Sequence, residues 1–244
     1  MQNTDLQTLW VYLSTSPLTG LTITLVAYLT AYTLHRKTGT HPLTNTVLIS
    51  VILLILILEV TGTEYATYFE GAQFIHFLLG PVTVALAIPL FQQFAQVKRL
   101  FIPIILSMVI GITVGTIAVM FIAKLLGADL ATQISLSARS VTAPVAMGIA
   151  EKIGGIPSLT AVLAVLTGII GAVLGTHYLN LLKIKDNSVK GIAIGNSSHG
   201  IGTARAFTLN TSMGAFAGLS MALAALLNAL MLPWLVKGFL LVTG

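Results

Sequence analysis

The sequence predicts an all-α polytopic membrane protein, with about six full spans and two polar segments that form re-entrant or broken-helix hairpins. Hydrophobic residues make up 56% of the 244 residues and charged residues only 8%, whereas soluble domains carry about 25% charged residues. Several apolar runs reach the roughly 20 residues that a helix needs to cross a bilayer. These runs do not alternate in polarity, as the strands of a membrane barrel would.

Composition also excludes several classes of function. The formal net charge is +5, which in a membrane protein reports the orientation of the loops rather than a nucleic-acid partner. The chain has no cysteine, so disulfides, thiolate metal sites and cysteine nucleophiles are excluded. The start, "MQNTDLQTLW", has neither a basic region nor a small-residue cleavage site, and we expect no removable signal peptide.

The N-terminal third begins with a short apolar stretch. Residues 6–14 are too few to span a bilayer. We expect them to form an interfacial helix with Trp10 and Tyr12 at the level of the headgroups. Two full spans are expected after this helix, at residues 18–34 and 43–60.

The remaining full spans are expected at residues 72–95, 102–126, 156–182 and 214–242. Prolines interrupt two of these runs, because proline lacks the N–H group that continues a helix. The run 72–95 is interrupted by Gly80-Pro81 and Pro89, and Pro233 is expected to kink or divide the last span. Five glycines in the spans are expected to allow close helix packing: Gly111, Gly115, Gly168, Gly171 and Gly175.

Two polar segments break the apolar pattern, at residues 128–155 and 188–211. Lysine and arginine are enriched in cytoplasmic loops. A full crossing by segment 128–155 would place the three lysines of residues 183–190 outside, against this rule. We therefore favour a re-entrant hairpin near 128–155. A second hairpin, near 188–211, would enter from the inside. Hairpins from opposite faces are typical of inverted-repeat transporter cores. "GPVTVALAIPL" at 80–90 weakly echoes "RSVTAPVAMGI" at 139–149, which either a duplication or common membrane composition explains.

The first polar segment, "SARSVTAPVAMGIAE", predicts an anion-binding helix start. Ser140 and Thr142 are preferred N-cap residues, and Pro144 suits the first turn. A half-helix that begins here inside the membrane offers free backbone N–H groups and a positive dipole end to an anion. Arg139 can add a bidentate contact to a carboxylate. The alternative for Arg139 is an extension to a lipid headgroup or a pairing with a nearby acid.

The second polar segment contains "GNSSHGIGTARAF" at residues 195–207. Its glycines allow non-helical turns, its hydroxyls can cap the next helix, and His199 can change protonation near neutral pH. Non-helical backbone at membrane depth is tolerated where it lines a wet cavity, so we expect a polar pocket for a small anion. The alternative is a cytoplasmic loop with ordinary helix caps. The predicted substrate-binding residues of the two segments are Arg139, Ser140, Thr142, Asn196, Ser197, Ser198, His199, Thr203 and Arg205.

Proton coupling has two candidate residues, Glu151 and His199, although Glu151 can equally pair with Lys152 or Arg205. The five histidines are scattered without paired carboxylates and form no recognisable metal-ligand set. No nucleophile elbow or P-loop occurs in the chain. We therefore expect no metal, no cofactor and no enzymatic activity.

Several long motifs resemble the LrgB/CidB family: "YFEGAQFIHFLLGPVTVALAIPL", "SVTAPVAMGIAEKIGGIPSLTAVLAVLTGIIGAVLG", "GIAIGNSSHGIGTARAF" and "GAFAGLSMAL". The resemblance runs from about Tyr68 to the C-terminus, and the N-terminal third is similar mainly in hydropathy. We therefore expect one membrane domain over residues 1–244, with scaffold-like spans at 1–70 and the family core at 71–244. Arg139 stands where the resemblance leads us to expect lysine in many relatives, which keeps the charge but not the geometry.

The resemblance implies a multi-pass protein of the bacterial inner membrane. Because plastid relatives carry glycolate and glycerate, and bacterial members have been linked to small monocarboxylates, it implies a secondary transporter of such acids, with proton coupling as an option. The family is also named for antiholin-like proteins that modulate murein hydrolases. This implies the alternative, a regulator of autolysis that acts with a small LrgA/CidA-type membrane protein.

The expected partners follow from these two functions. They are a small carboxylate anion, membrane lipid and the small LrgA/CidA-type protein, and a nucleic-acid partner is not expected. A homodimer is also expected, since so small a carrier needs a scaffold.

Overall fold

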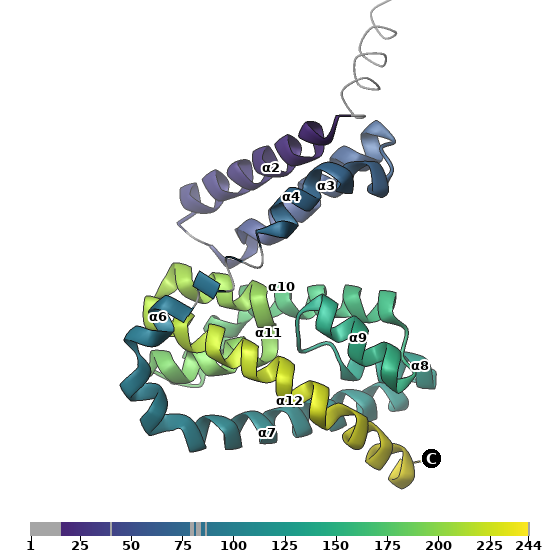
Figure 1. Ribbon diagram of the computed structural model, residues 1–244, viewed down its shortest axis with the longest axis vertical. Coiled ribbons are helices and arrows are strands. Elements are labelled where there is room, and N and C mark those ends of the chain that lie inside the picture. Colours follow the sequence, from purple (N-terminus) through teal and green to yellow (C-terminus); the bar gives the residue numbers. More distant parts are fainter. Residues whose placement is uncertain (1–15, 40, 79–80, 82–83, 86, 244) are drawn as a thin grey trace, which may run out of the picture. The chain divides into compact units, whose positions relative to one another are not determined.

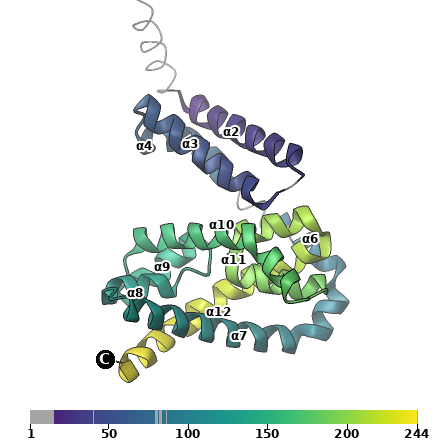
Figure 2. The same ribbon diagram turned by 180° about the vertical axis from the view of Figure 1, so that it is seen from behind.

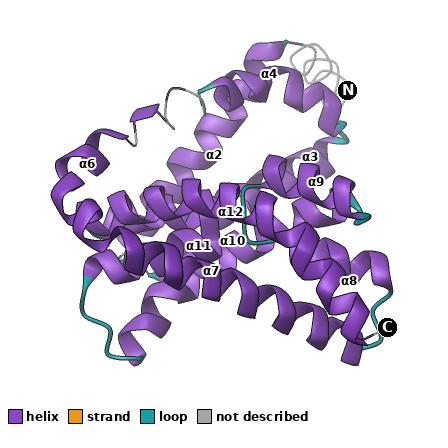
Figure 3. Ribbon diagram, turned by 60° about the horizontal axis from the view of Figure 1, so that its bottom comes forward, coloured by secondary structure: helices purple, strands orange, loops and turns teal. Residues whose placement is uncertain are grey.

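The computed structural model describes residues 16–39, 41–78, 81, 84–85 and 87–243. Contacts divide the chain into two compact units, Met1–Ala85 and Leu86–Gly244 (Figure 1). The described residues form helices joined by turns (Figure 3), which confirms the all-α prediction. The interfacial helix expected at residues 6–14 lies outside the described residues.

The N-terminal unit contains α2 (Pro17–Lys37), a short 3-10 turn (Pro42–Thr44), α3 (Thr46–Thr61) and α4 (Tyr65–Phe77). Asn45 caps α3, because its Oδ1 accepts hydrogen bonds from the N–H groups of Val47 and Leu48 at 3.0 and 3.2 Å. Helix α2 packs closely against α4, where the hydroxyls of Thr24 and Tyr68 are hydrogen bonded at 2.8 Å. A methyl group on Gly20 would overlap the carbonyl oxygen of Tyr68, so only glycine allows this approach.

The C-terminal unit contains the helices that carry both polar segments (Figures 1 and 2). They are α6 (Ala87–Gln92), α7 (Phe94–Leu125), α8 (Leu130–Ser137), α9 (Ala143–Ile153), α10 (Pro157–Leu181), α11 (Asn187–Leu209) and α12 (Thr211–Thr243). Helix α11 packs against both α10 and α12, and α7 packs against α8 and α12. The core of this unit includes Ile104, Met108, Val141, Phe216 and Leu232.

In the described part of the chain, four helices are long and apolar enough to cross a membrane: Leu18–Lys37, Phe94–Leu125, Pro157–Leu181 and Thr211–Thr243. They coincide with the spans expected at 18–34, 102–126, 156–182 and 214–242. The span expected at 43–60 is α3, a shorter apolar helix.

The three expectations about proline differ in outcome. Residues 72–95 do not form one helix, because α4 ends at Phe77 and α6 begins at Ala87, on either side of the expected Gly80-Pro81 interruption. The interruption expected at Pro89 is wrong, because Pro89 lies inside α6 (Ala87–Gln92). Pro233 likewise lies inside α12 without dividing it. Leu232 and Val236 are buried beside Pro233, and this packing holds the helix together across the N–H group that proline lacks.

Candidate functional site

Residues 128–155 fold as a helix–turn–helix, which agrees with the predicted hairpin. Helix α8 begins at Asp129, whose Oδ1 accepts a hydrogen bond from the Thr132 N–H group at 2.7 Å. A turn separates α8 from α9, and α9 ends at Gly154, whose φ of 88° suits glycine. The Ser135 hydroxyl of α8 accepts a hydrogen bond from the Ile156 N–H group at 2.8 Å, and so joins the segment after α9 to α8. The insertion of this hairpin into the membrane stays a prediction.

The start of α9 has the cap position that the sequence predicts, but its side chain does not cap. Thr142 is the N-cap residue, with φ −60° and ψ 144°, and its hydroxyl makes no capping hydrogen bond. Its carbonyl oxygen accepts the first helical bond, from the Ala146 N–H group at 2.9 Å. Ser140 lies in the preceding turn. Thr142 therefore leaves the N–H groups of Ala143 and Val145 uncapped, and Pro144 between them has no N–H group.

Helix α11 is broken in its middle, at His199. This residue has φ 41° and ψ −132°, although the residues on both sides are helical. A non-glycine residue in this region of φ is strained, and such strain persists only where the surroundings impose it. The second polar segment is therefore a broken helix of two halves rather than a hairpin with a loop.

Helix α10 imposes the break. The His199 ring donates from Nε2 to the carbonyl oxygen of Ala164 at 2.9 Å. A Cβ atom on Gly168 would lie 2.6 Å from Cε1 of His199, and one on Gly171 would overlap the hydroxyl of Ser198. The expectation that these glycines permit close packing is confirmed at Gly168 and Gly171.

The helix start after the break lies beside the start of α9. Gly200 is the first residue after the break, and a Cβ atom on it would lie 4.0 Å from Cγ2 of Thr142 and 3.8 Å from Sδ of Met221. The two polar segments are thus brought together in space, 58 residues apart in sequence between Thr142 and Gly200. Two helix starts, each with a positive dipole end, therefore lie in one region.

Each of the two predicted arginines donates a hydrogen bond within its own segment. Arg139 is half-buried in the hairpin turn, and its Nη1 donates to the carbonyl oxygen of Leu136 at 3.1 Å. Arg205 is half-buried on the second half of α11, and its Nη1 donates to the Thr208 hydroxyl at 3.4 Å. Arg139 lies on one of the two segments that meet at Thr142 and Gly200, and Arg205 lies on the other.

The predicted hydroxyl residues divide by their burial. Ser198 and Thr203 are buried, whereas Ser197 is exposed. Thr203 donates to the carbonyl oxygen of His199 at 2.7 Å, and Ser197 donates to that of Ala193 at 2.8 Å. The hydroxyl protons of Thr203 and Ser197 are therefore donated within α11, and the lone pairs of these two oxygens can still accept hydrogen bonds.

Two predicted residues lie away from the junction of Thr142 and Gly200. Glu151 is exposed in the last turn of α9, nine residues after Thr142 and so roughly 13 Å along the helix. Asn196 precedes the break and faces α7, where a Cβ atom on Gly111 would lie 3.0 Å from Nδ2 of Asn196. The role of Glu151 in proton coupling stays a prediction.

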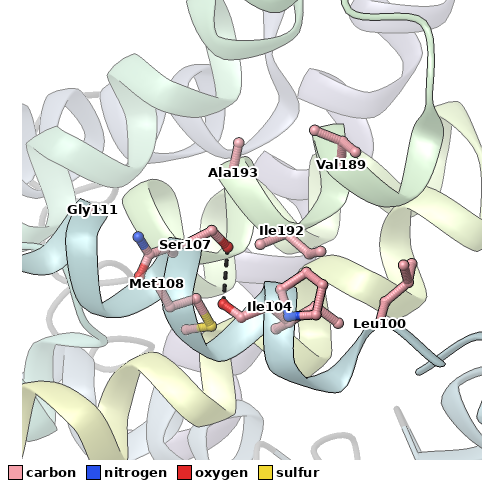
Figure 4. A pocket seen from close by; sticks show the side chains of 10 residues that line it. Leu100, Ile104, Ser107, Met108, Gly111, Val189, Ile192 and Ala193 are labelled. Carbon is pink, nitrogen blue, oxygen red and sulfur yellow. Dashed lines mark hydrogen bonds between the residues drawn. The ribbon is translucent and has the colours of Figure 1, made fainter. Parts of the chain in front are cut away.

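A pocket between α7 and α11 was missed by sequence reasoning. Its volume is about 480 Å³, and Figure 4 shows the side chains that line it. Gly111 was the one signal of this contact in the sequence, where it was interpreted as a packing residue only. The lining residues are Leu100, Pro103, Ile104, Ser107, Met108, Gly111, Val189, Ile192, Ala193 and Asn196.

Carboxylates cap two other helix starts of this unit. The hydroxyl and the N–H group of Thr132 hold the pKa of Asp129 below its ordinary value. The N–H groups of Ser188 and Val189 do the same for the pKa of Asp186 at the start of α11. No group of three or more histidine, aspartate or glutamate side chains that could hold a metal ion occurs among the described residues.

Comparisons with known proteins identify the family. The model of the LrgB-like family matches residues 24–238. The uncharacterized protein YwbG of Bacillus subtilis is 34% identical over 89% of this chain and 96% of its own length. The holin-like protein CidB is 32% identical in Staphylococcus epidermidis and 30% identical in Staphylococcus aureus, in both cases over 89% of this chain and 94% of the relative.

The chain therefore belongs to the LrgB-like family, as its motifs indicated. Together with the four apolar helices of the described region, this makes it a multi-pass bacterial membrane protein. No solved structure matches the chain significantly.

Proposed function

We propose that this member of the LrgB-like family binds a small monocarboxylate where the start of α9 meets the break in α11, and carries it across the membrane. One observation supports this most: Gly200 and Thr142 lie within van der Waals reach, so two helix starts converge. The side chain of Thr142 does not cap the first turn of α9, and no carboxylate directly precedes Gly200 in the sequence.

The chemistry of this junction favours an anion. Free N–H groups at a helix start donate hydrogen bonds, and the helix dipole favours a negative charge there. The oxygens of a carboxylate can accept from both helix starts at once. Arg139 and Arg205 lie on the same two segments, and a guanidinium matches a carboxylate with two parallel hydrogen bonds. A small acid therefore suits the site better than a neutral solute.

The setting of the site favours transport over simple binding. Helices interrupted at membrane depth are characteristic of secondary transporters, whose substrates bind at the interrupted points. In this proposal the hairpin 128–155 and the broken α11 enter from opposite faces. The substrate meets Arg139, Ser140, Thr142, Ser198, His199 and Arg205, while Asn196, Ser197 and Thr203 shape its surroundings. His199 or Glu151 carries a coupled proton.

Uptake into proteoliposomes tests this proposal. Acetate, lactate, pyruvate, glycolate and glycerate are offered to purified protein, with and without a pH gradient. We expect uptake by the wild type and at least a tenfold loss in Arg205→Ala, because the charge-assisted contact is removed. Correct folding is checked by size-exclusion chromatography and thermal unfolding. No uptake of any acid by well-folded wild type contradicts the proposal.

A second function is favoured by the names of relatives. CidB of two Staphylococcus species is named as holin-like, and these names support a regulatory role more directly than a carrier role. In this proposal the chain modulates murein hydrolases and autolysis with a small LrgA/CidA-type membrane protein. Cell lysis measured in a deletion strain tests it. If both the Arg139→Ala and the Arg205→Ala variants restore normal lysis to the deletion strain, this function is favoured over transport.

A further inference from the structure

The pocket between α7 and α11 runs along both helices for about the depth of one membrane leaflet. Its lining extends from Leu100 to Gly111 on α7 and from Val189 to Asn196 on α11. This stretch of α7 is roughly 16 Å long. One leaflet supplies about 15 Å of the hydrocarbon core of a bilayer. The described lining includes no charged side chain, so its chemistry also matches an acyl chain.

Both helices begin at the same end of the pocket. At that end, Nε2 of Gln96 on α7 donates to the hydroxyl of Ser188 on α11 at 2.7 Å. At the far end, a Cβ atom on Gly111 would lie 3.0 Å from Nδ2 of Asn196. The two helices therefore run in parallel along the pocket, and their first turns lie at the same membrane surface.

One side of the pocket is exposed along α7. Pro103, Ser107 and Gly111 line the pocket and are exposed, and their spacing of four residues places them in one row on the helix surface. Ser107 donates its hydroxyl proton to the carbonyl oxygen of Ile104 at 2.9 Å, as Figure 4 shows. Because this proton is already donated, a carbon chain can lie along the row without leaving a donor unpaired.

Basic residues lie at the end of the pocket where the two helices begin. Arg99 is four residues before Pro103 and so continues the exposed row of α7. On the other side, Lys185 is four residues before Val189, and both Arg99 and Lys185 are exposed. The nearby carboxylate of Asp186 already accepts hydrogen bonds from the first N–H groups of α11. This end of the pocket therefore offers two cations to a ligand.

The volume of the pocket suits an acyl chain better than a helix of another protein. A volume of about 480 Å³ along roughly 16 Å leaves a cross-section of about 30 Å². A helix with its side chains is about 10–12 Å across and occupies roughly three times that cross-section. A second copy of this chain, or a small membrane partner, could therefore enter the pocket only with single side chains.

The basic end of the pocket fits a phosphate group. Lysine and arginine beside membrane spans mark the cytoplasmic side, and the cytoplasmic leaflet carries anionic lipids that such residues attract. A guanidinium binds a phosphate with two parallel hydrogen bonds. A phosphate bound at Arg99 would lie at the membrane surface, and the chain attached to it would enter the pocket along Pro103 and Ser107.

We propose that the pocket between α7 and α11 binds one acyl chain of an anionic phospholipid from the cytoplasmic leaflet, with the lipid phosphate at Arg99 and Lys185. Because lipid tails are as apolar as the lining, the chain gains only packing contacts in the pocket, and the charge of the headgroup makes the site selective. The bound lipid holds α7 against the first half of α11. This site does not depend on the proposed carboxylate site at Thr142 and Gly200.

Native mass spectrometry of the purified protein in a neutral detergent tests the inference, because it counts bound lipids. The matched probes are dioleoyl-phosphatidylglycerol and dioleoyl-phosphatidylcholine, which share their chains and differ in the charge of the headgroup. We expect saturable binding of phosphatidylglycerol, roughly tenfold or more tighter than that of phosphatidylcholine, because each basic residue near a membrane surface contributes about fivefold. Glycerol 3-phosphate, a phosphate without acyl chains, should not displace phosphatidylglycerol.

Two variants, each with a matched control, separate the headgroup from the chain. Arg99→Gln should weaken phosphatidylglycerol binding roughly fivefold, whereas Lys98→Gln, about 100° around α7 from Arg99, should keep an affinity close to that of the wild type. Ala193→Phe fills the pocket and should remove the saturable lipid. Ala118→Phe, exposed on α7 outside the lining, should keep it. Thermal unfolding without lipid checks that each variant is folded.

Four outcomes would overturn the proposal. Equal wild-type affinity for the two phospholipids, or equal affinity of Arg99→Gln and Lys98→Gln for phosphatidylglycerol, removes the role of the basic end. A folded Ala193→Phe protein that keeps the saturable lipid places the chain outside the pocket. Displacement of phosphatidylglycerol by glycerol 3-phosphate assigns the basic end to a free phosphate compound. A dimer that Ala193→Phe converts to monomer in size-exclusion chromatography, with lipid binding unchanged, assigns the pocket to a second copy of the chain.

Discussion

The C-terminal unit contains two kinds of helix start. Asp129 begins α8 and Asp186 begins α11, and each carboxylate accepts hydrogen bonds from the first N–H groups of its helix. At the start of α9, Thr142 makes no such bond. The restart of α11 after His199 follows Ser197, Ser198 and His199, and so has no carboxylate directly before it.

The difference between these helix starts indicates where an anion would bind. A helix start that carries its own carboxylate has its positive end neutralised within the chain. Two of the starts that lack a carboxylate, those of α9 and of the second half of α11, lie side by side at Thr142 and Gly200. No carboxylate cap neutralises the positive dipole ends of these two neighbouring starts.

The two interior starts also differ in what produces them. The hairpin turn before α9 is encoded locally, by cap residues and Pro144 in the first turn. The break in α11 is imposed from outside, because α10 presents the Ala164 carbonyl oxygen and two glycines to it. Substitutions in α10 should consequently damage α11 more than substitutions in α11 itself.

The largest effect is expected from Gly171→Ala. Its methyl group would overlap the Ser198 hydroxyl, and overpacking of this kind costs about 1–3 kcal/mol. Gly175→Ala is the matched control, since the nearest atom to its Cβ position, Cγ1 of Ile194, lies 3.8 Å away. Thermal unfolding in detergent measures both. Equal melting temperatures for the two variants would show that α10 does not impose the break.

The next effect concerns the strain at His199. His199→Gly and His199→Ala lose the same hydrogen bond to Ala164, but glycine adopts a φ of 41° without strain. We expect the glycine variant to be more stable by about 1 kcal/mol. In an unbroken helix the order reverses, because glycine is there about 1 kcal/mol less favourable than alanine. The sign of the difference in unfolding free energy between the two variants therefore shows whether α11 is broken or unbroken at His199.

The smallest effect separates capped from uncapped starts. Asp186→Ala should lower the unfolding free energy by about 0.5–1 kcal/mol, through loss of a solvent-exposed cap. Thr142→Ala should change it little, because its hydroxyl caps nothing. A cost for Thr142→Ala equal to that for Asp186→Ala would contradict the distinction.

The cap at Asp186 also predicts that the free energy of unfolding depends on pH. Because hydrogen bonds from Ser188 and Val189 hold the pKa of Asp186 below its ordinary value of 3.8, the folded state favours the ionised form. The stability that Asp186 contributes is fully present above pH 3.8 and is lost as the pH falls through the lowered pKa. Unfolding measured across this range should show the wild type and Asp186→Ala converging at low pH.

The sequence predicted the parts of this unit that depend on local chemistry. The hairpin at 128–155, the N-cap position of Thr142 and the packing role of Gly171 all follow from residue types and their spacing. The break at His199 was not predictable at that residue, because three nearby glycines are better suited to a turn. Its position depends on α10, and so does the burial of Ser198. The orientation of Asn196 toward α7 is likewise a tertiary property.

The central claim is that a carboxylate binds between Thr142 and Gly200, and Gly200→Ala tests it most directly. Its methyl group would meet Thr142 and Met221 at ordinary contact distances of 4.0 and 3.8 Å, so it fills the space for an anion without forcing neighbours apart. Gly148→Ala, on α9 with no atom within 4 Å of its Cβ position, is the control. Acetate affinity is measured by thermal stabilisation. The account predicts roughly tenfold weaker binding for Gly200→Ala, as expected when a charge-assisted contact worth about 1.4 kcal/mol is lost, and wild-type binding for Gly148→Ala. Wild-type acetate affinity in both variants would contradict it.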